Sequence, residues 1–208
     1  MVIKMKTSVA ELTKRIVEKE ILKIGNFTLK SGKTSWFYLD LRLLSSYPDT
    51  FNFAIQSYKQ ILKGIGNFDA VAGVAVAGVP FSSVLGYSLK KPSLIVRGQQ
   101  KDHGLKKKVE GTLPINSSVV LIDDLITTGS SKIPGILALR EMGFIVRDMV
   151  VLVDRSQGQS GQINQLGVKL HYFASIEDIF TESLLLDDKI LDPEKKKIIE
   201  SNLHNVTI

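Results

Sequence analysis

The middle of the chain alternates between short segments that are apolar throughout and segments with helical spacing of apolar residues. Strands that are apolar along their whole length need burial on both faces, and helices separate them here, so the pattern predicts a mostly parallel sheet with helices on both faces. The predicted strands are Ala70–Val74, Ser93–Val96, Ser118–Ile122, Phe144–Val153 and Val168–Ala174, and the predicted helices are Pro80–Leu89, Ser130–Met142 and Gly161–Leu166. The fold class is therefore α/β.

The two ends of the chain add further elements. Ser8 to Glu11 fits a capping box, and apolar residues at helical spacing continue to Ile24, so a helix is predicted there with Gly25 as its stop. Short strands are predicted at 27–30 and 35–41, and a helix from Pro48 to Lys63. C-terminal helices are predicted to start at Ser175 and Pro193. No linker divides the chain, which indicates one core with an N-terminal appendage of helix and short strands.

Composition limits the classes of function. Hydrophobic residues make up 44% of the 208 residues, enough to oppose chain entropy, and the absence of cysteine excludes disulfide scaffolds, Cys-ligated zinc and thiol catalysis. The net charge of +6 suggests an anionic partner, which on this ground alone is nucleic acid, a membrane surface or a phosphorylated small molecule. No signal peptide or membrane-spanning run stands out, so a cytoplasmic protein without a membrane partner is expected.

The segment Val119–Ser131 (VVLIDDLITTGSS) is the strongest functional signal. It predicts a buried strand, two adjacent acids and a Thr/Gly/Ser-rich turn that leads into a helix, and ligands of parallel sheets bind at this end of a strand. The turn can bind a phosphate through backbone amides and hydroxyls, while Asp123 and Asp124 can accept hydrogen bonds from vicinal hydroxyls. A capped helix without a ligand is the plainer interpretation, but the combination in register favours a holder for ribose 5-phosphate.

This segment resembles the phosphoribosyl-diphosphate (PRPP) motif of the type I phosphoribosyltransferases. The resemblance implies that Asp123 and Asp124 hold the ribose hydroxyls and that residues 127–131 bind the 5′-phosphate. It also implies a type I phosphoribosyltransferase-like core with a small hood and a flexible catalytic loop. The chain would then be a single phosphoribosyltransferase domain, 1–208, with the hood at approximately 1–45 and the core at approximately 46–208.

Four further segments resemble the orotate phosphoribosyltransferase family: a hood-like segment at 27–40, R-x-x-x-K-D-H-G at 97–104, D-R-x-x-G at 154–158, and a pyrophosphate loop at 74–80. The resemblance implies catalytic roles for Arg97, Lys101, Asp102 and His103. It implies orotate contacts from Phe37, Tyr38, Leu39, Thr127 and Arg155, with the arginine on the carboxylate. It implies PRPP contacts from Lys30, Ala77, Gly78, Arg97, Lys101, His103, Asp123, Asp124, Leu125, Ile126, Thr127, Thr128, Gly129, Ser130 and Ser131.

Three positions depart from the pattern of that family. Gly98 stands where a second basic residue often follows the loop arginine, and Ala77 stands where some members have a lysine. Binding of the departing pyrophosphate is therefore expected to depend on backbone amides, Lys101 and a metal ion. Trp36 occupies a hood position where proline is common, so the base contacts of the hood are the least determined part of the resemblance.

The resemblance implies transfer of ribose 5-phosphate from PRPP to N1 of orotate, giving orotidine 5′-monophosphate and pyrophosphate. It implies Mg²⁺ as cofactor, held mainly by the substrate pyrophosphate and ribose hydroxyls, with Asp123 and Asp124 reaching it through water. It also implies a homodimer in which the catalytic loop serves the neighbouring subunit, and no nucleic-acid partner. The alternatives are a purine phosphoribosyltransferase, which Arg155 disfavours, and a PRPP-responsive regulator of the same fold, for which no DNA-binding module is evident.

Overall fold

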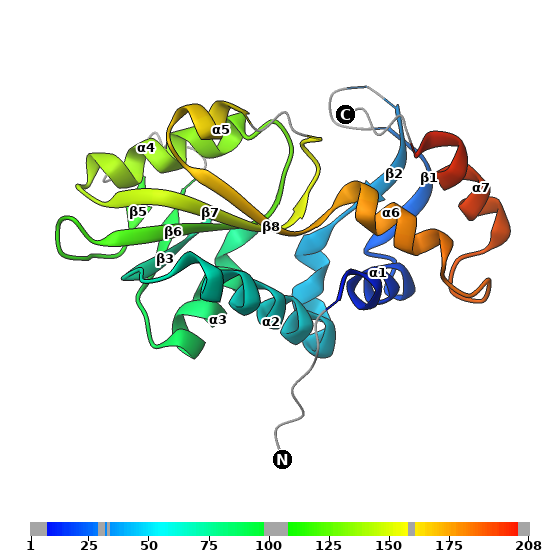
Figure 1. Ribbon diagram of the computed structural model, residues 1–208, viewed down its shortest axis with the longest axis horizontal. Helices are drawn as coiled ribbons and strands as arrows, with labels where there is room; N and C mark the ends of the chain where they lie inside the picture. The colour runs from blue at the N-terminus through cyan, green and yellow to red at the C-terminus, as the bar shows by residue number, and fades with distance from the viewer. Residues whose placement is uncertain (1–7, 29–31, 33, 98–107, 158–160, 204–208) are drawn as a thin grey trace, which may run out of the picture. The chain divides into compact units, whose positions relative to one another are not determined.

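The computed structural model describes residues 8–28, 32, 34–97, 108–157 and 161–203. The chain divides into two compact units, drawn in Figure 1. One unit comprises residues 1–56 together with 174–208, and the other comprises 57–173. The segment expected as a hood therefore shares its unit with the C-terminal helices, which the sequence analysis did not anticipate.

The unit of residues 57–173 is built on a sheet that has six strands among the described residues, in the order β5-β4-β3-β6-β7-β8. Its central pairings are parallel: β3 pairs with β4 and with β6, and β6 pairs with β7. The short β5 runs antiparallel to β4 at one edge. This confirms the mostly parallel sheet. The strands are β3 (Ala70–Val74), β4 (Ser93–Val96), β5 (Val109–Glu110), β6 (Ser118–Ile126), β7 (Ile145–Asp154) and β8 (Lys169–Ser175).

Helices cover both faces of this sheet (Figure 1). Helix α3 (Gly78–Leu89) lies on one face, and α4 (Ile133–Glu141) and α5 (Gly161–Gln165) lie on the other. The apolar strands β3 and β6 are buried along almost their whole length, and side chains from α4 and α5, such as Ile136 and Ile163, pack against them. A sheet buried on both faces is what the continuous apolar runs predict.

The other unit contains a two-stranded antiparallel sheet and helices from both ends of the chain. Ser175 and Asp178 form the predicted capping box at the start of α6, and Asp192 caps α7. The elements are α1 (Val9–Glu18), β1 (Leu22–Thr28), β2 (Thr34–Leu39), the 3-10 helix η1 (Leu41–Ser46), α6 (Ile176–Leu184) and α7 (Pro193–Asn202). Helix α2 (Pro48–Ile65) begins in this unit and continues into the other.

The structure corrects the predicted ends of the first helix and of the central strand. The first helix ends at Glu18, and Leu22 and Ile24 belong to β1, where Leu22 lies opposite Leu39 of β2. Their apolar spacing fits a helix as well as a strand, and pairing with β2 decides between them. The strand predicted to end at Ile122 continues to Ile126, because β7 pairs with it through the two acids.

No helix in the described part of the chain is long and apolar enough to cross a membrane.

Candidate active site

The carboxyl ends of four neighbouring strands meet at one edge of the six-stranded sheet. Strands β3, β4, β6 and β7 are parallel to one another, so their last residues lie at the same edge. Val74 pairs with Val96, and Ile126 pairs with Asp154, which aligns the strand ends. The segments that follow these strands carry Ala77 and Gly78, Arg97, the Thr/Gly/Ser loop and Arg155. This edge is where open α/β sheets bind ligands.

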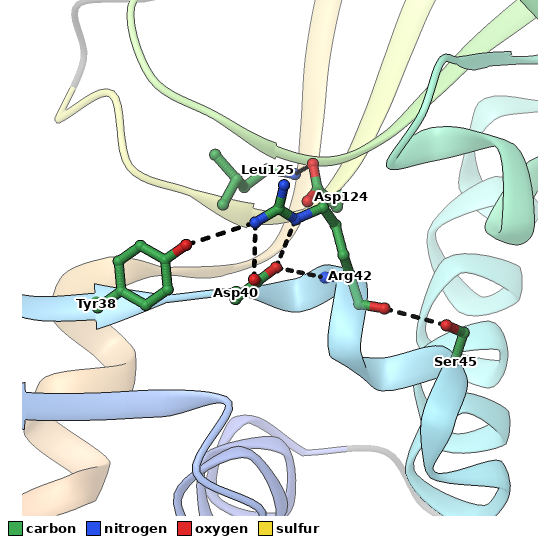
Figure 2. A network of polar contacts seen from close by, with 6 residues as sticks. All are labelled: Tyr38, Asp40, Arg42, Ser45, Asp124 and Leu125. Atoms are coloured by element: carbon green, nitrogen blue, oxygen red, sulfur yellow. Dashed lines mark hydrogen bonds and ion pairs between the residues drawn. The ribbon is translucent and has the colours of Figure 1, made fainter. Parts of the chain in front are cut away.

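The two acids lie within β6, close to its carboxyl end, and are almost fully buried. Asp123 Oδ1 accepts a hydrogen bond from the Asp124 amide at 3.0 Å. Asp124 Oδ1 accepts one from the Leu125 amide at 2.7 Å, as Figure 2 shows. Burial raises the pKa of both carboxyls, that of Asp123 to about 6. Each carboxylate therefore depends on local donors to remain ionised at neutral pH.

Lys132 supplies a charged donor that the sequence analysis missed. Its ammonium group forms an ion pair with Asp123 Oδ2, and only 14% of the lysine side chain and 2% of the aspartate side chain are exposed. The pairing lowers the pKa of Asp123 and opposes the effect of burial. The separation of nine residues gives no helical or strand relationship, so only the fold of the intervening loop brings the pair together.

The loop between β6 and α4 turns sharply at Gly129. This glycine has φ 80°, which side-chain-bearing residues rarely adopt, and a Cβ there would lie 2.8 Å from Cδ1 of Ile163. Thr128 and Ser130 lie on the exposed side, with their hydroxyl oxygens 3.1 Å apart. The loop leads into the 3-10 helix η2 (Ser130–Lys132), and α4 starts only at Ile133. The predicted start of this helix at Ser130 was therefore early, as Pro134 fixes the first α-helical turn later in the sequence.

The turn after β3 brings its backbone against β6. Gly78 begins α3, and a Cβ on this residue would collide with the carbonyl oxygen of Ile122 and lie 3.1 Å from Oδ1 of Asp123. Ala77, at the N-cap, makes no side-chain capping bond. The peptide bond between Ala75 and Val76 is cis. Glycine at position 78 thus allows the amino end of α3 to approach the first acid.

Two arginines flank these segments. Arg97 follows β4, where its guanidinium forms an ion pair with Glu110 of β5 at 2.8 Å. This partner was not foreseen, because the antiparallel β5 was not predicted. Arg155 follows β7, and its amide donates to the Ile126 carbonyl at 2.8 Å. Burial lowers the pKa of the Arg155 guanidinium, which remains a cation at neutral pH.

The three aromatic and apolar residues expected to contact a base lie on β2, in the other unit. The side chains of Phe37 and Leu39 are buried, and Phe37 packs edge-on against Phe180 of α6 with ring centroids 5.0 Å apart. Tyr38 points to the opposite face and is 39% exposed. Of the three, Tyr38 has the side chain available to a ligand, while Phe37 and Leu39 support the strand from behind.

A polar network contacts the Tyr38 hydroxyl (Figure 2). Asp40 accepts two bonds from the Arg42 guanidinium, at 2.6 and 2.7 Å, and the same guanidinium lies 3.4 Å from the Tyr38 hydroxyl. The hydrogen bonds from Arg42 lower the pKa of Asp40. Arg42 also donates through its amide to Asp40, and its carbonyl accepts from Ser45. The sequence analysis did not single out Asp40 or Arg42.

Four of the predicted site residues lie outside the described part of the chain: Lys30, Lys101, Asp102 and His103. Within the unit of residues 57–173, the structure places the other predicted residues at a single sheet edge. These comprise the acids, the Thr/Gly/Ser loop, Ala77 with Gly78, and the two arginines. No group of three or more His, Cys, Asp or Glu side chains that could hold a metal ion is present among the described residues.

A paired acid and a Thr-Thr-Gly-Ser-Ser loop at the end of a central parallel strand define a phosphoribosyltransferase. The model of the phosphoribosyl transferase domain matches residues 52–165, more than half of the chain. Similarity to individual relatives narrows the class. The chain is 36% identical to the orotate phosphoribosyltransferase of Sulfolobus acidocaldarius over 94% of this chain and 98% of the relative. It is 39% identical to that of Saccharolobus solfataricus over 92% and 96%. The chain belongs to the orotate phosphoribosyltransferase family.

Solved structures agree with this assignment. The crystal structure of orotate phosphoribosyltransferase from Aeropyrum pernix superimposes with a TM-score of 0.77 at 32% identity, covering 85% of this chain and 99% of that chain. The chain also matches the structure of Leishmania donovani UMP synthase with a TM-score of 0.79 at 30% identity, covering 95% of this chain but 42% of that longer one.

Proposed function

We propose that the protein transfers ribose 5-phosphate from PRPP to N1 of orotate, releasing pyrophosphate and orotidine 5′-monophosphate. The observation that carries this proposal is the hydrogen bond between the Arg155 amide and the Ile126 carbonyl. It holds the backbone of residue 155 at the end of β6, where the Thr/Gly/Ser loop begins, and the guanidinium of an arginine is suited to a carboxylate. A purine has no carboxylate for that arginine to bind, so orotate fits this edge better.

The PRPP site is assigned to the strand ends of β6 and β3. Asp123 and Asp124 accept hydrogen bonds from the ribose hydroxyls, and the amides and hydroxyls of residues 125–131 bind the 5′-phosphate. The backbone around Ala77 and Gly78 receives the pyrophosphate, because the close approach of Gly78 to β6 brings the amino end of α3 to this edge. Arg97, already oriented by Glu110, adds a cation near the departing pyrophosphate.

The reaction requires stabilisation of negative charge on the departing pyrophosphate while the ribose develops oxocarbenium character. Lys101 and Arg97 supply positive charge. His103 can donate a hydrogen bond or a proton to the departing oxygen, and Asp102 belongs to the same catalytic loop. The proposal assigns a PRPP contact to Lys30. It assigns orotate contacts to Phe37, Tyr38 and Leu39, and to Thr127 and Arg155.

Mg²⁺ is the proposed cofactor. Asp123 and Asp124 are hard oxygen donors of the kind this ion prefers, and two buried carboxylates next to a polyphosphate site suit it. When bound, the ion would neutralise charge on the pyrophosphate, which supplies most of its ligands together with the ribose hydroxyls. The two acids would help to hold it through water. The chain itself contributes the orientation of the ribose and the exclusion of water.

A direct assay tests the reaction. The purified chain is mixed with PRPP, Mg²⁺ and one base at a time, and consumption of orotate is followed by absorbance and compared with adenine, hypoxanthine and uracil. Activity with orotate alone supports the proposal. Activity with a purine alone, or with none of the bases, contradicts it. An Arg155→Gln variant is expected to lose orotate affinity by about tenfold or more while its affinity for PRPP remains close to that of the parent.

We propose further that the enzyme is a cytoplasmic homodimer whose catalytic loop completes the site of the neighbouring subunit. Lys101→Ala and the double variant Asp123→Ala/Asp124→Ala are expected to be inactive alone. Mixed dimers of the two would contain one intact site assembled from both chains and regain part of the activity. Mixed dimers that stay inactive would show that each subunit uses its own loop.

A further inference from the structure

The ion pair between Lys132 and Asp123 joins the two ends of the phosphate loop. Asp123 lies in β6 before the loop, and Lys132 is the last residue of η2 after it. The Lys132 amide also donates to the Gly129 carbonyl at 2.9 Å. Residues 124–131 are therefore fixed at both ends, by the sheet on one side and by a largely buried ion pair on the other.

The charge of Lys132 has a second consequence. Asp123 and Asp124 are adjacent and nearly buried, and the charge of Asp124 raises the pKa of Asp123. Tyr58 faces Asp123 from α2 as a neutral hydroxyl donor to its carbonyl oxygen, and so supplies no positive charge. Among the described residues, Lys132 is the cation in contact with the Asp123 carboxylate. Its positive charge offsets the negative charge of one of the two carboxylates, both of which must lie beside a highly anionic substrate.

We infer that Lys132 is a positioning residue for PRPP: its ion pair with Asp123 orients this carboxylate and holds the phosphate loop folded before the substrate binds. The inference rests on the proposed function, which assigns Asp123 to the ribose and the loop to the 5′-phosphate. Lys132 acts through Asp123 and does not touch the substrate. It follows that its removal weakens PRPP binding and leaves orotate binding unchanged.

The first test compares Lys132→Met with the parent, using calorimetric PRPP binding in the presence of Mg²⁺ and steady-state kinetics for both substrates. The expected result is a rise of about tenfold or more in Kd and KM for PRPP, with KM for orotate within about twofold of the parent. Lys132→Arg, which keeps the charge, is expected to restore PRPP binding to within a few-fold. Lys169→Met is the matched control, since Lys169 is an exposed lysine at the start of β8 in the same unit.

The second test asks whether Lys132 acts through Asp123. Lys132→Met leaves a buried carboxylate without its cation and can unfold the chain, whereas Asp123→Asn/Lys132→Met removes both charges. If Lys132 only positions Asp123, the double variant binds PRPP as Asp123→Asn alone does. If Lys132 contacts the substrate itself, the double variant loses about a further tenfold, and the inference is overturned.

The outcomes separate this inference from the proposed function. A parent chain that fails to bind PRPP overturns both. A parent that binds PRPP, with a folded Lys132→Met variant that binds it within about twofold as tightly, overturns the inference alone, whatever the change in thermal stability. Selective loss of PRPP affinity, rescue by arginine and non-additivity with Asp123→Asn together establish the positioning role.

Discussion

The Tyr58 hydroxyl donates a hydrogen bond of 2.6 Å to the backbone carbonyl of Asp123, and both residues are buried. Burial raises the pKa of Tyr58 well above its ordinary value, so the phenol remains a donor at any physiological pH. Its ring also packs against Phe81 of α3, with centroids 5.2 Å apart. The part of α2 in this unit thus holds the backbone of β6 at the residue that carries the first acid.

Removal of this hydroxyl is expected to destabilise the protein. Tyr58→Phe leaves a buried carbonyl without this donor, which costs about 1–3 kcal/mol of the free energy of unfolding. Urea unfolding measures the loss. Tyr87→Phe is the control, because Tyr87 is 89% exposed and the same change there should alter stability by less than about 0.5 kcal/mol. Equal stability of the two variants would show that the Tyr58 hydroxyl contributes nothing.

The raised pKa of Asp123 predicts a pH dependence of stability. The folded protein keeps the Asp123 proton up to about pH 6, whereas the ordinary pKa is 3.8. Between these values the folded state binds more protons, so the free energy of unfolding falls as pH rises, by at most about 1.4 kcal/mol per pH unit from this group. The contribution is fully present below about pH 4 and is lost as pH rises through 6.

Asp123→Asn isolates this contribution, since every other carboxyl titrates in both proteins. The free energy of unfolding of the parent minus that of the variant, measured in urea from pH 4 to pH 7, should decrease as pH rises. Parallel profiles would contradict the shifted pKa. PRPP binding to the parent should follow the opposite direction and strengthen through about pH 6, as the ionised carboxylate is the better hydroxyl acceptor.

Short apolar segments between turn residues were predictable from the sequence. Strands 70–74 and 93–96 have the predicted bounds, because an apolar run between turn residues leaves little choice. The acids of the ribose motif also lie at the predicted sheet edge. The end of β6 was not predictable in this way, since two ionisable residues normally terminate a buried strand. The strand continues because it pairs with β7 and because Asp123 has partners in Lys132 and Tyr58.

Partners that are distant along the chain were the other omission. In the sequence, Lys132 lies in the first turn of a predicted helix, and Glu110 follows a run of lysines. Neither position indicates a contact with the site. Their contacts with Asp123 and Arg97 arise only when the Thr/Gly/Ser loop and the antiparallel β5 have formed. The burial of Phe37 against Phe180 depends likewise on a C-terminal helix that joins the N-terminal segment. Local patterns identify reactive residues better than they identify the residues that orient them.

The polar network of Tyr38, Asp40 and Arg42 predicts a selective effect on orotate binding. Asp40→Asn should release the Arg42 guanidinium, loosen the Tyr38 hydroxyl and raise KM for orotate by a few-fold, because an exposed ion pair contributes modestly. Tyr38→Ala, which removes the ring, should raise it by about tenfold. Steady-state kinetics with each substrate varied measures both. Tyr172→Ala, an exposed tyrosine on β8, is the control, and an unchanged KM for orotate in Tyr38→Ala would remove Tyr38 from the base site.

Gly129 and Gly167 form a matched pair for testing the phosphate loop. Both have positive φ, 80° and 67°, so alanine at either position should cost about 1–2 kcal/mol of stability through backbone strain. A Cβ at Gly167 has open space around it, whereas one at Gly129 would press on Ile163 and displace the loop. Gly129→Ala should therefore raise KM for PRPP by about tenfold, and Gly167→Ala should leave it unchanged. Equal KM values for PRPP in the two variants would show that the position of this turn does not control phosphate binding.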